Sequence, residues 1–477
     1  MTDDPTPHSP DWARRLQALD SAHYLHPFTD SKALAARGAR IIVRGEGYHV
    51  WDAQGQRMLD AMSGLWCVNV GYGRRELADA AHAQMMTLAY YNSFFNTTNE
   101  PAVELAARLC ELAPGPAGRR FSHVFFTGSG SESNDTNIRL VRHYWASQGQ
   151  PERQIIISRR NAYHGSTMGG ASLGGMAGMH AQGGLPIPGI VHIDEPNALA
   201  NALPGESAHD FGLRMARQLE DQILALGPEQ VAAFIGEPVQ GAGGVIVPPA
   251  SYWPEIQRIC DTYGLLLISD EVICGFGRLG HWFGYEAMGY QPDLVTFAKG
   301  VTSGYVPLGG VLVGERVAKG LIEQGGEFQH GYTYSGHPVA CQVALANLDI
   351  LTREHLLEQV RTHSGPCLAR AYEGLLQHPL VGQVQTCGMT AALVLMQDPA
   401  RQIRFAPHWA VGMRCRAHCF DNGLVMRAVG DRMIIAPPLI MRAPDIDLLM
   451  ARIRHCLDLT LAELHAVGAL SGAYNNP

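Results

Sequence analysis

A lysine and an aspartate each follow an apolar run, and the two residues lie 29 positions apart. Lys299 follows residues 294–298 and Asp270 follows residues 265–269, and both runs are typical of buried strands. In open α/β sheets ligands bind beyond the carboxyl ends of the strands, so the two side chains could face one site. Pyridoxal phosphate chemistry needs such a pair, because a lysine forms a Schiff base with the cofactor aldehyde and a carboxylate pairs with the pyridinium nitrogen. Taken alone, a solvated turn and a helix start explain the two residues more simply.

Composition and charge narrow the classes of function. The chain has 477 residues, 46% of them hydrophobic. This length suits two or more domains, or one large α/β domain with an appendage. A net charge of −8 provides no basic face for nucleic acid or for an anionic membrane. We find no signal-peptide pattern at the start and no apolar stretch long enough to span a bilayer.

The cysteines point to a reducing compartment rather than to a metal site. Ten cysteines are scattered from Cys67 to Cys456, and scattered cysteines in a long chain indicate the cytoplasm. Cys415 and Cys419, with His418 between them, form the only tight group. One face of a helix explains this spacing better than zinc, because structural zinc needs four ligands. We therefore expect no metal.

The pattern of apolar runs predicts an α/β fold. Residues 1–70 form an arm and a small antiparallel meander with glycine turns. Residues 71–335 alternate helix patterns with apolar runs, which is typical of a large domain with a mostly parallel, seven-stranded sheet. Residues 336–477 predict a smaller α+β domain, on which the N-terminal meander packs. The expected strands of the large sheet are residues 124–127, 155–158, 189–193, 231–235, 265–269, 294–297 and 310–313.

A glycine- and serine-rich turn follows the first of these strands. Ser129, Gly130 and Ser131 stand between residues 124–127 and the start of a helix pattern. Free backbone N–H groups at a helix N-terminus, together with the helix dipole and a serine hydroxyl, make a cradle for phosphate. An ordinary capped turn is equally consistent with the pattern.

Two further loops also follow expected strands. Tyr163 and His164 come after residues 155–158, where an aromatic ring can stack on a planar cofactor. Glu237 comes after residues 231–235 and opens a glycine-rich loop that suits a cofactor pocket. Taken alone, the first segment is better explained as a plain loop with one aromatic residue, and the second could be a turn that happens to be glycine-rich.

Three other segments contain residues that could take part in chemistry, and two of them have simpler explanations. Residues 275–280 match the dinucleotide pattern G-x-G-x-x-G, but five residues separate them from the preceding strand and no clear helix follows. Arg427 lies in an apolar segment, where a guanidinium needs a partner, and a structural ion pair is the simpler explanation. Residues 330–338 offer hydroxyl groups on a loop between the expected domains.

Taken together, the order of these motifs resembles the class III (subgroup II) pyridoxal phosphate-dependent aminotransferases of fold type I. Within them, the chain is most similar to the ω-amine:pyruvate transaminases, which include β-alanine–pyruvate and putrescine–pyruvate enzymes. The segments that carry the resemblance are residues 25–30, 64–73, 237–249, 270–278 and 333–338. They span nearly the whole chain, and they are specific for the fold and the reaction but much less so for the substrate.

The resemblance implies a role for each motif residue. Lys299 is the Schiff-base lysine and proton shuttle, and Asp270 pairs with the ring nitrogen. The other expected cofactor contacts are Ser129, Gly130 and Ser131 at the phosphate, Tyr163 and Val272 on the two ring faces, Glu237 and His164 around the ring, and Thr333 at the phosphate of the neighbouring subunit. The expected substrate-binding residues are Phe28, Trp66, Phe94, Tyr163 and a mobile Arg427 that binds the substrate carboxylate.

The chain departs from the subgroup in two places. Ala162 stands where the subgroup usually has glycine, so we expect a small backbone adjustment before Tyr163. Residues 194–201 stand where the subgroup tends to carry an aromatic cluster, which leaves this loop without an expected role.

We therefore expect a cytoplasmic aminotransferase, assembled as a homodimer or homotetramer. It should move an amino group from a primary amine or ω-amino acid to pyruvate by a ping-pong mechanism. A decarboxylase or racemase of the same fold type is the near alternative, because the fold does not decide the reaction. A nicotinamide (NAD)-dependent dehydrogenase built on residues 275–280 is the remote one. The sequence does not rank putrescine, β-alanine, taurine or an arylalkylamine as the donor.

Overall fold

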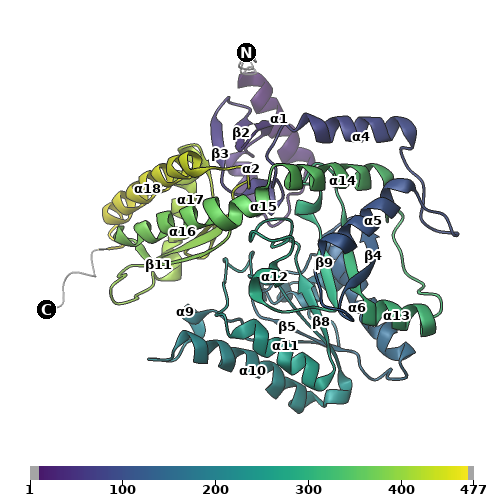
Figure 1. Cartoon of the computed structure of the whole chain (residues 1–477). Helices are drawn as coiled ribbons and strands as arrows, with labels where there is room; N and C mark the ends of the chain where they lie inside the picture. Colours follow the sequence, from purple (N-terminus) through teal and green to yellow (C-terminus); the bar gives the residue numbers. More distant parts are fainter. Residues whose placement is uncertain (1–9, 471–477) are drawn as a thin grey trace.

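The computed structural model describes residues 10–470, and a sheet of seven strands lies at its centre (Figure 1). The strand order is β4-β10-β9-β8-β7-β5-β6. Only β10 runs antiparallel to its two neighbours, and the other pairs are parallel. The strands are β4 (Phe121–Thr127), β5 (Ile155–Arg159), β6 (Ile190–Ile193), β7 (Val231–Gly236), β8 (Leu266–Asp270), β9 (Leu294–Phe297) and β10 (Gly309–Gly314).

Helices cover both faces of this sheet, as its sequence requires. β7 and β8 are buried along their whole length, which is the mark of a parallel sheet that is covered on both sides. Successive residues enter different cores: Phe234 belongs to one buried cluster and Ile235 to another. The helices of this region are α4 (Arg75–Thr87), α5 (Glu100–Leu112), α6 (Gly130–Ser147), α7 (Met168–Leu173), α8 (Ala177–His180), α9 (Ala198–Asn201), α10 (Ala208–Leu226), α11 (Tyr252–Tyr263), α12 (Gly284–Met288) and α13 (Glu315–Gln324).

A second, smaller part is built from both ends of the chain. In one four-stranded sheet, β13 of the C-terminal region pairs in parallel with β3 of the N-terminal meander, with Leu424 opposite Leu59. The strands of the two small sheets are β1 (Ile42–Glu46), β2 (His49–Asp52), β3 (Arg57–Asp60) and β13 (Leu424–Val425), and β11 (Val381–Cys387), β12 (Thr390–Leu395), β15 (Arg432–Ile435) and β14 (Arg427–Val429). The remaining helices are α1 (Pro10–His23), α2 (Ser31–Arg37), α3 (Ser63–Trp66), α14 (Pro338–Arg353), α15 (Leu356–Gln359), α16 (Gly365–Glu373), α17 (Val411–Asp421) and α18 (Ala443–Ala466).

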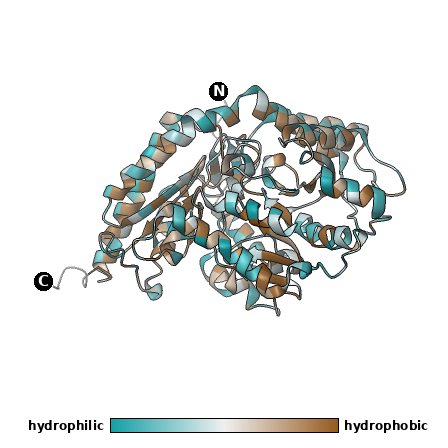
Figure 2. Cartoon of the chain, turned by 60° about the horizontal axis from the view of Figure 1, so that its bottom comes forward, coloured by the Kyte–Doolittle hydropathy of each residue, from teal (hydrophilic) through white to brown (hydrophobic). Residues whose placement is uncertain are grey.

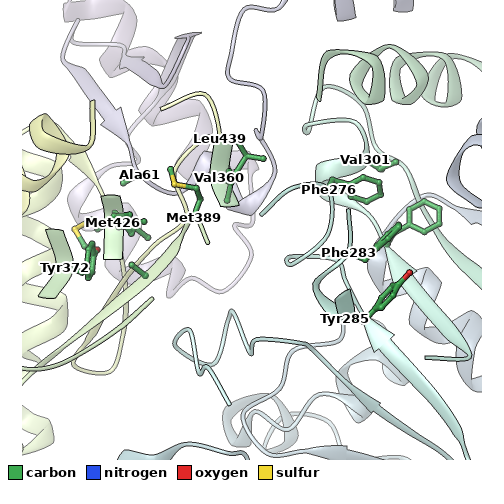
Figure 3. Packing of buried hydrophobic residues seen from close by; sticks show 14 of the residues in the cluster. Ala61, Phe276, Phe283, Tyr285, Val301, Val360, Tyr372, Met389, Met426 and Leu439 are labelled. Atoms are coloured by element: carbon green, nitrogen blue, oxygen red, sulfur yellow. The ribbon is translucent and has the colours of Figure 1, made fainter. Parts of the chain in front are cut away.

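One hydrophobic core joins the two parts. Figure 3 shows Tyr372 and Met426 in the smaller part and Phe276 and Phe283 near the large sheet, all members of one buried cluster. Figure 2 shows hydrophilic and hydrophobic residues alternating along the outer helices, as expected for helices that bury one face. The predicted fold class is therefore confirmed. The domain boundaries after residues 70 and 335 stay a proposal.

The structure shows neither a membrane-spanning helix nor a metal site among residues 10–470. No helix there is both long and apolar enough to cross a membrane. No group of three or more histidine, cysteine or acidic side chains in the same range could hold a metal ion. Cys415 and Cys419 lie together on α17, buried in the core.

Candidate active site

Lys299 lies at the C-terminal end of the large sheet, immediately beyond β9. It begins the 3-10 helix η2 (Lys299–Val301) with a φ of +47°, a left-handed conformation that is uncommon for a non-glycine residue. It lines a cavity of about 350 Å³. Burial lowers the pKa of the Lys299 amino group, which favours the neutral, nucleophilic amine.

Asp270 ends the neighbouring strand β8 and lines the same cavity. Its Oδ2 accepts hydrogen bonds from His164 Nδ1 at 2.7 Å and Asn134 Nδ2 at 2.8 Å. Its Oδ1 accepts from the backbone N–H of Val272 at 3.1 Å. These contacts hold both oxygens of the Asp270 side chain in place at the cavity wall, where the group can pair with a cationic ring nitrogen.

The turn after β4 forms a narrow cradle at the N-terminus of α6. Ser129 caps the helix, and its hydroxyl accepts the backbone N–H of Glu132 at 3.2 Å. A Cβ at Gly130 would lie 2.9 Å from Val272 Cγ2, so only glycine fits this position without a shift. The first turn of a helix presents unpaired N–H groups and a positive dipole end. The cradle therefore fits a phosphate.

Two further loops close the cavity beside Lys299. Glu237 follows β7 and fixes the loop that carries Tyr163, because its Oε1 accepts the Tyr163 backbone N–H at 3.2 Å. Burial raises the pKa of the Glu237 carboxyl group. Tyr163 is half-buried and lines the cavity, and the buried Nε2 of His164 has no partner in the described chain. A cavity with an aromatic wall and an unpaired buried nitrogen fits a polar ring.

Comparisons with known proteins decide the family. The sequence model of the class-III aminotransferases matches residues 34–457. The chain belongs to this family. It is 54% identical over 454 residues to the putrescine–pyruvate aminotransferase of Pseudomonas aeruginosa, covering 95% of this chain and 98% of that protein.

Solved structures of ω-transaminases have the same fold. An (S)-enantioselective ω-transaminase from Thermomicrobium roseum superimposes with a TM-score of 0.90 at 46% identity, covering 94% of this chain and 99% of that one. The ω-transaminase from Pseudomonas jessenii, in complex with PMP, gives a TM-score of 0.91 at 41% identity, covering 95% and 99%. The chain is therefore an aminotransferase, and pyridoxal phosphate is its cofactor, as predicted.

Membership of this family does not favour the decarboxylase, racemase or dehydrogenase that the sequence left as alternatives. Residues 275–280, which match the dinucleotide pattern, do not line the cavity of Lys299. The Arg278 side chain is buried and donates to Asn69 Oδ1 at 2.6 Å. The segment therefore links the large-sheet region to the loop that follows α3, and Gly277 and Gly280 adopt φ values of +94° and +84°, so the glycine pattern has a structural explanation.

The structure brings most of the predicted cofactor contacts to one cavity. The predicted residues that line it are Ser129, Gly130, Ser131, Tyr163, His164, Glu237, Asp270, Val272 and Lys299. The other predicted site residues do not line this cavity in one chain, namely Thr333, Phe28, Trp66, Phe94 and Arg427.

These five residues have different surroundings. Phe28 is 74% exposed, with its ring centroid 6.3 Å from that of Tyr163. Trp66 is buried in a cluster that includes Ile273, a residue of the cavity wall. Phe94 lines a separate surface cavity of about 330 Å³. Thr333 is exposed, and its carbonyl oxygen accepts a hydrogen bond from Tyr90 at 2.8 Å.

Arg427 is half-buried at the start of β14 and lies within electrostatic range of Tyr163. Burial lowers the pKa of its guanidinium. Among residues 10–470, no ion pair or side-chain hydrogen bond involves Arg427. The structural ion pair considered from the sequence is therefore absent from the described chain.

Sequence reasoning missed Asn134 and Cys67, which both line the cavity. Burial raises the pKa of the Cys67 thiol, so the side chain is a neutral part of the wall. The polar run that begins α6 was a usable sign for Asn134, because a helix that covers a sheet should present apolar residues to it.

The loop of residues 194–201 supports the cavity from outside. Glu195 Oε1 accepts Asn161 Nδ2 at 2.8 Å, two residues before Tyr163. Arg432 of the smaller part donates to Asn197 Oδ1 at 3.0 Å. None of these loop residues lines the cavity. Ala162 is buried and is not among the residues with a left-handed backbone, so this turn does not require the subgroup's usual glycine.

Proposed function

We propose that this aminotransferase moves an amino group from a primary amine or ω-amino acid to pyruvate. The observation that carries the proposal is Arg427, a half-buried arginine without a partner in the described chain, near Tyr163. The wall formed by Val272, Ile273 and Val306 is apolar and suits an uncharged amine tail. The name of the Pseudomonas aeruginosa relative, a putrescine–pyruvate aminotransferase, supports the same pair of substrates.

We assign the cofactor contacts as the resemblance predicts. The cradle of Ser129, Gly130 and Ser131 would hold the phosphate, and Tyr163 and Val272 would cover the two ring faces. Asp270 would pair with the ring nitrogen, while Glu237 and His164 order the surroundings. Thr333 is too exposed to serve the cavity of its own chain, which supports its assignment to the phosphate of a neighbouring subunit.

In the proposed mechanism the side chains of this protein position the reactants and move protons. Bound pyridoxal phosphate supplies an aldehyde for the amino group and a ring that accepts electrons from the substrate carbon. Lys299, freed when the amine binds, would take the proton from that carbon and deliver it to C4′ of the cofactor. The negative charge of Asp270 favours the protonated form of the ring nitrogen. Water would release the oxidised amine as an aldehyde or ketone, and pyruvate would then take up the retained amino group by the same steps in reverse and leave as alanine.

Two substrate types must share one cavity. An arylalkylamine has an uncharged tail, whereas pyruvate carries a carboxylate. An arginine without a fixed partner can turn toward the carboxylate and bind it with two hydrogen bonds. When the amine is bound, the arginine can turn away, and the cavity stays apolar. Arg427 therefore allows the same apolar wall to serve both half-reactions.

A panel of amines with pyruvate tests the proposed function. We expect alanine to form with at least one of putrescine, β-alanine, taurine and an arylalkylamine, and not to form with the Lys299→Ala protein. Mass spectrometry of the products separates the alternatives. Release of carbon dioxide without alanine would indicate a decarboxylase, and activity with other keto acids but not with pyruvate would remove pyruvate as the acceptor.

We also propose that the enzyme is at least a homodimer in the reducing cytoplasm, where its ten cysteines stay free. Large exposed apolar side chains gather in residues 85–95, among them Met86 at 76% and Phe95 at 88% exposure. Exposed apolar groups of this kind mark interaction surfaces. A two-fold interface over this segment would also bring Thr333, whose carbonyl binds Tyr90, to the partner's site.

Sedimentation of the cofactor-loaded protein should therefore give at least twice the 51.8 kDa of one chain. Phe95→Glu should weaken the assembly and the activity together, because a buried charge at an interface is costly. Leu448→Glu on α18, where the side chain is 40% exposed, is the matched control and should change neither. A fully active monomer would show that Thr333 does not act across subunits.

A further inference from the structure

Asn134 is a buried amide that connects α6 to the carboxylate of Asp270. It lies in the second turn of the helix, and its side chain has no exposure to solvent. Its Nδ2 donates one hydrogen bond to Asp270 Oδ2 and one to the backbone oxygen of His164, both at 2.8 Å. His164 Nδ1 is the other donor to Oδ2. Asn134 thus holds the carboxylate directly and also holds the loop that carries its second donor.

The orientation of this amide is fixed by its other end. Asn134 Oδ1 accepts Thr296 Oγ1 at 2.9 Å and Asn137 Nδ2 at 3.1 Å. A flipped amide would place its oxygen against the Asp270 carboxylate and the His164 carbonyl, and the hydrogen bonds to both of them and from Asn137 Nδ2 would be lost. Thr296 lies on β9 directly opposite Asp270 on β8. The helix and the two catalytic strands are therefore locked together by one buried polar network.

This arrangement gives α6 two functions that lie one turn apart. Its first turn contains Gly130 and Ser131, the proposed phosphate cradle, and its second turn contains Asn134. The helix therefore fixes the distance between the phosphate cradle and the carboxylate. A hydrogen bond from a neutral donor to a buried carboxylate also favours the charged form of that carboxylate.

We propose that Asn134 is a positioning residue that aims the Asp270 carboxylate at the ring nitrogen of the cofactor. The inference rests on the proposed pairing of Asp270 with that nitrogen. Without the amide, the Asp270 carboxylate is no longer held toward the ring nitrogen, and it stabilises the protonated state of that nitrogen less. The bound cofactor then becomes a weaker electron acceptor, and its coloured link to Lys299 titrates at a higher pH.

The test compares two alanine variants from the same helix. Asn134→Ala removes the donor to Asp270. Asn137→Ala removes an equally buried amide that donates to Asn134 Oδ1 and Thr296 Oγ1 but does not touch Asp270. Both should lower the melting temperature of the holoenzyme, because both leave buried polar groups unpaired. Only Asn134→Ala should raise the pH midpoint of the cofactor absorbance, by about one unit, and slow the amine half-reaction about 10- to 100-fold.

Asp270→Asn is the reference for the proposed pairing. If it leaves the absorbance midpoint unchanged, then Asp270 is not the partner of the ring nitrogen and the proposed site itself fails. If Asp270→Asn moves the midpoint and Asn134→Ala does not, Asn134 is only structural and this inference is wrong. Should Asn134→Ala not fold, Asn134→Ser gives the same reading, because its hydroxyl is too short to reach Asp270 and the same shift is expected.

Discussion

Lys299→Ala is expected to reduce turnover at least about 1,000-fold, because the substitution removes both the cofactor-linking amine and the proton shuttle. The phosphate cradle and Asp270 remain, so the variant should still bind pyridoxal phosphate. It should bind without the lysine adduct that borohydride reduction traps in the native protein. Intact-mass analysis after reduction, followed by peptide mapping, measures this directly.

The small number of lysines lets peptide mapping identify the lysine that binds the cofactor. The protein has only three lysines, Lys32, Lys299 and Lys319. Lys32 and Lys319 are exposed on α2 and α13, whereas Lys299 lines the cavity. Lys319→Ala is the matched control and should keep both the adduct and full activity. A reduced adduct on Lys32 or Lys319 would overturn the assignment of Lys299.

Arg427→Ala should separate the two half-reactions. Loss of a charge-assisted, two-point contact with a carboxylate costs about 2–4 kcal/mol when the site is largely dry. This corresponds to a decrease of about 30- to 1,000-fold in the half-reaction with pyruvate. The half-reaction with an arylalkylamine should change far less, because that substrate has no carboxylate. Single-turnover absorbance kinetics of each half-reaction measures the difference.

Arg416→Ala is a suitable control for Arg427. Arg416 lies on α17 within electrostatic range of Arg427, and its guanidinium packs over the ring of Phe420 at 5.1 Å. Its removal should affect neither half-reaction selectively. Equal losses in both halves for Arg427→Ala would show that Arg427 is structural. The carboxylate of pyruvate would then need another partner.

The sequence by itself determined the large sheet and the pair at its edge. The central strands are buried on both faces, so they appear as unbroken apolar runs such as residues 231–235, and helix patterns separate them. Lys299 and Asp270 stand where such runs end, and the carboxyl ends of parallel strands meet at one edge. The family and its cofactor could be predicted for the same reason. The motifs that carry the resemblance are short, and the residues of each motif are contiguous in the sequence.

Only the tertiary structure decided which distant residues complete the site. The short strands β13 and β14 have too few residues for a periodic pattern, and they form because β3 and β15 offer partners from elsewhere in the chain. Asn134 reads as one polar residue in a helix, and it acquires a role only where α6 crosses β8 and β9. Hydrogen bonds between residues more than 100 positions apart, such as Asn134 with Asp270, leave no spacing in the sequence that could predict them.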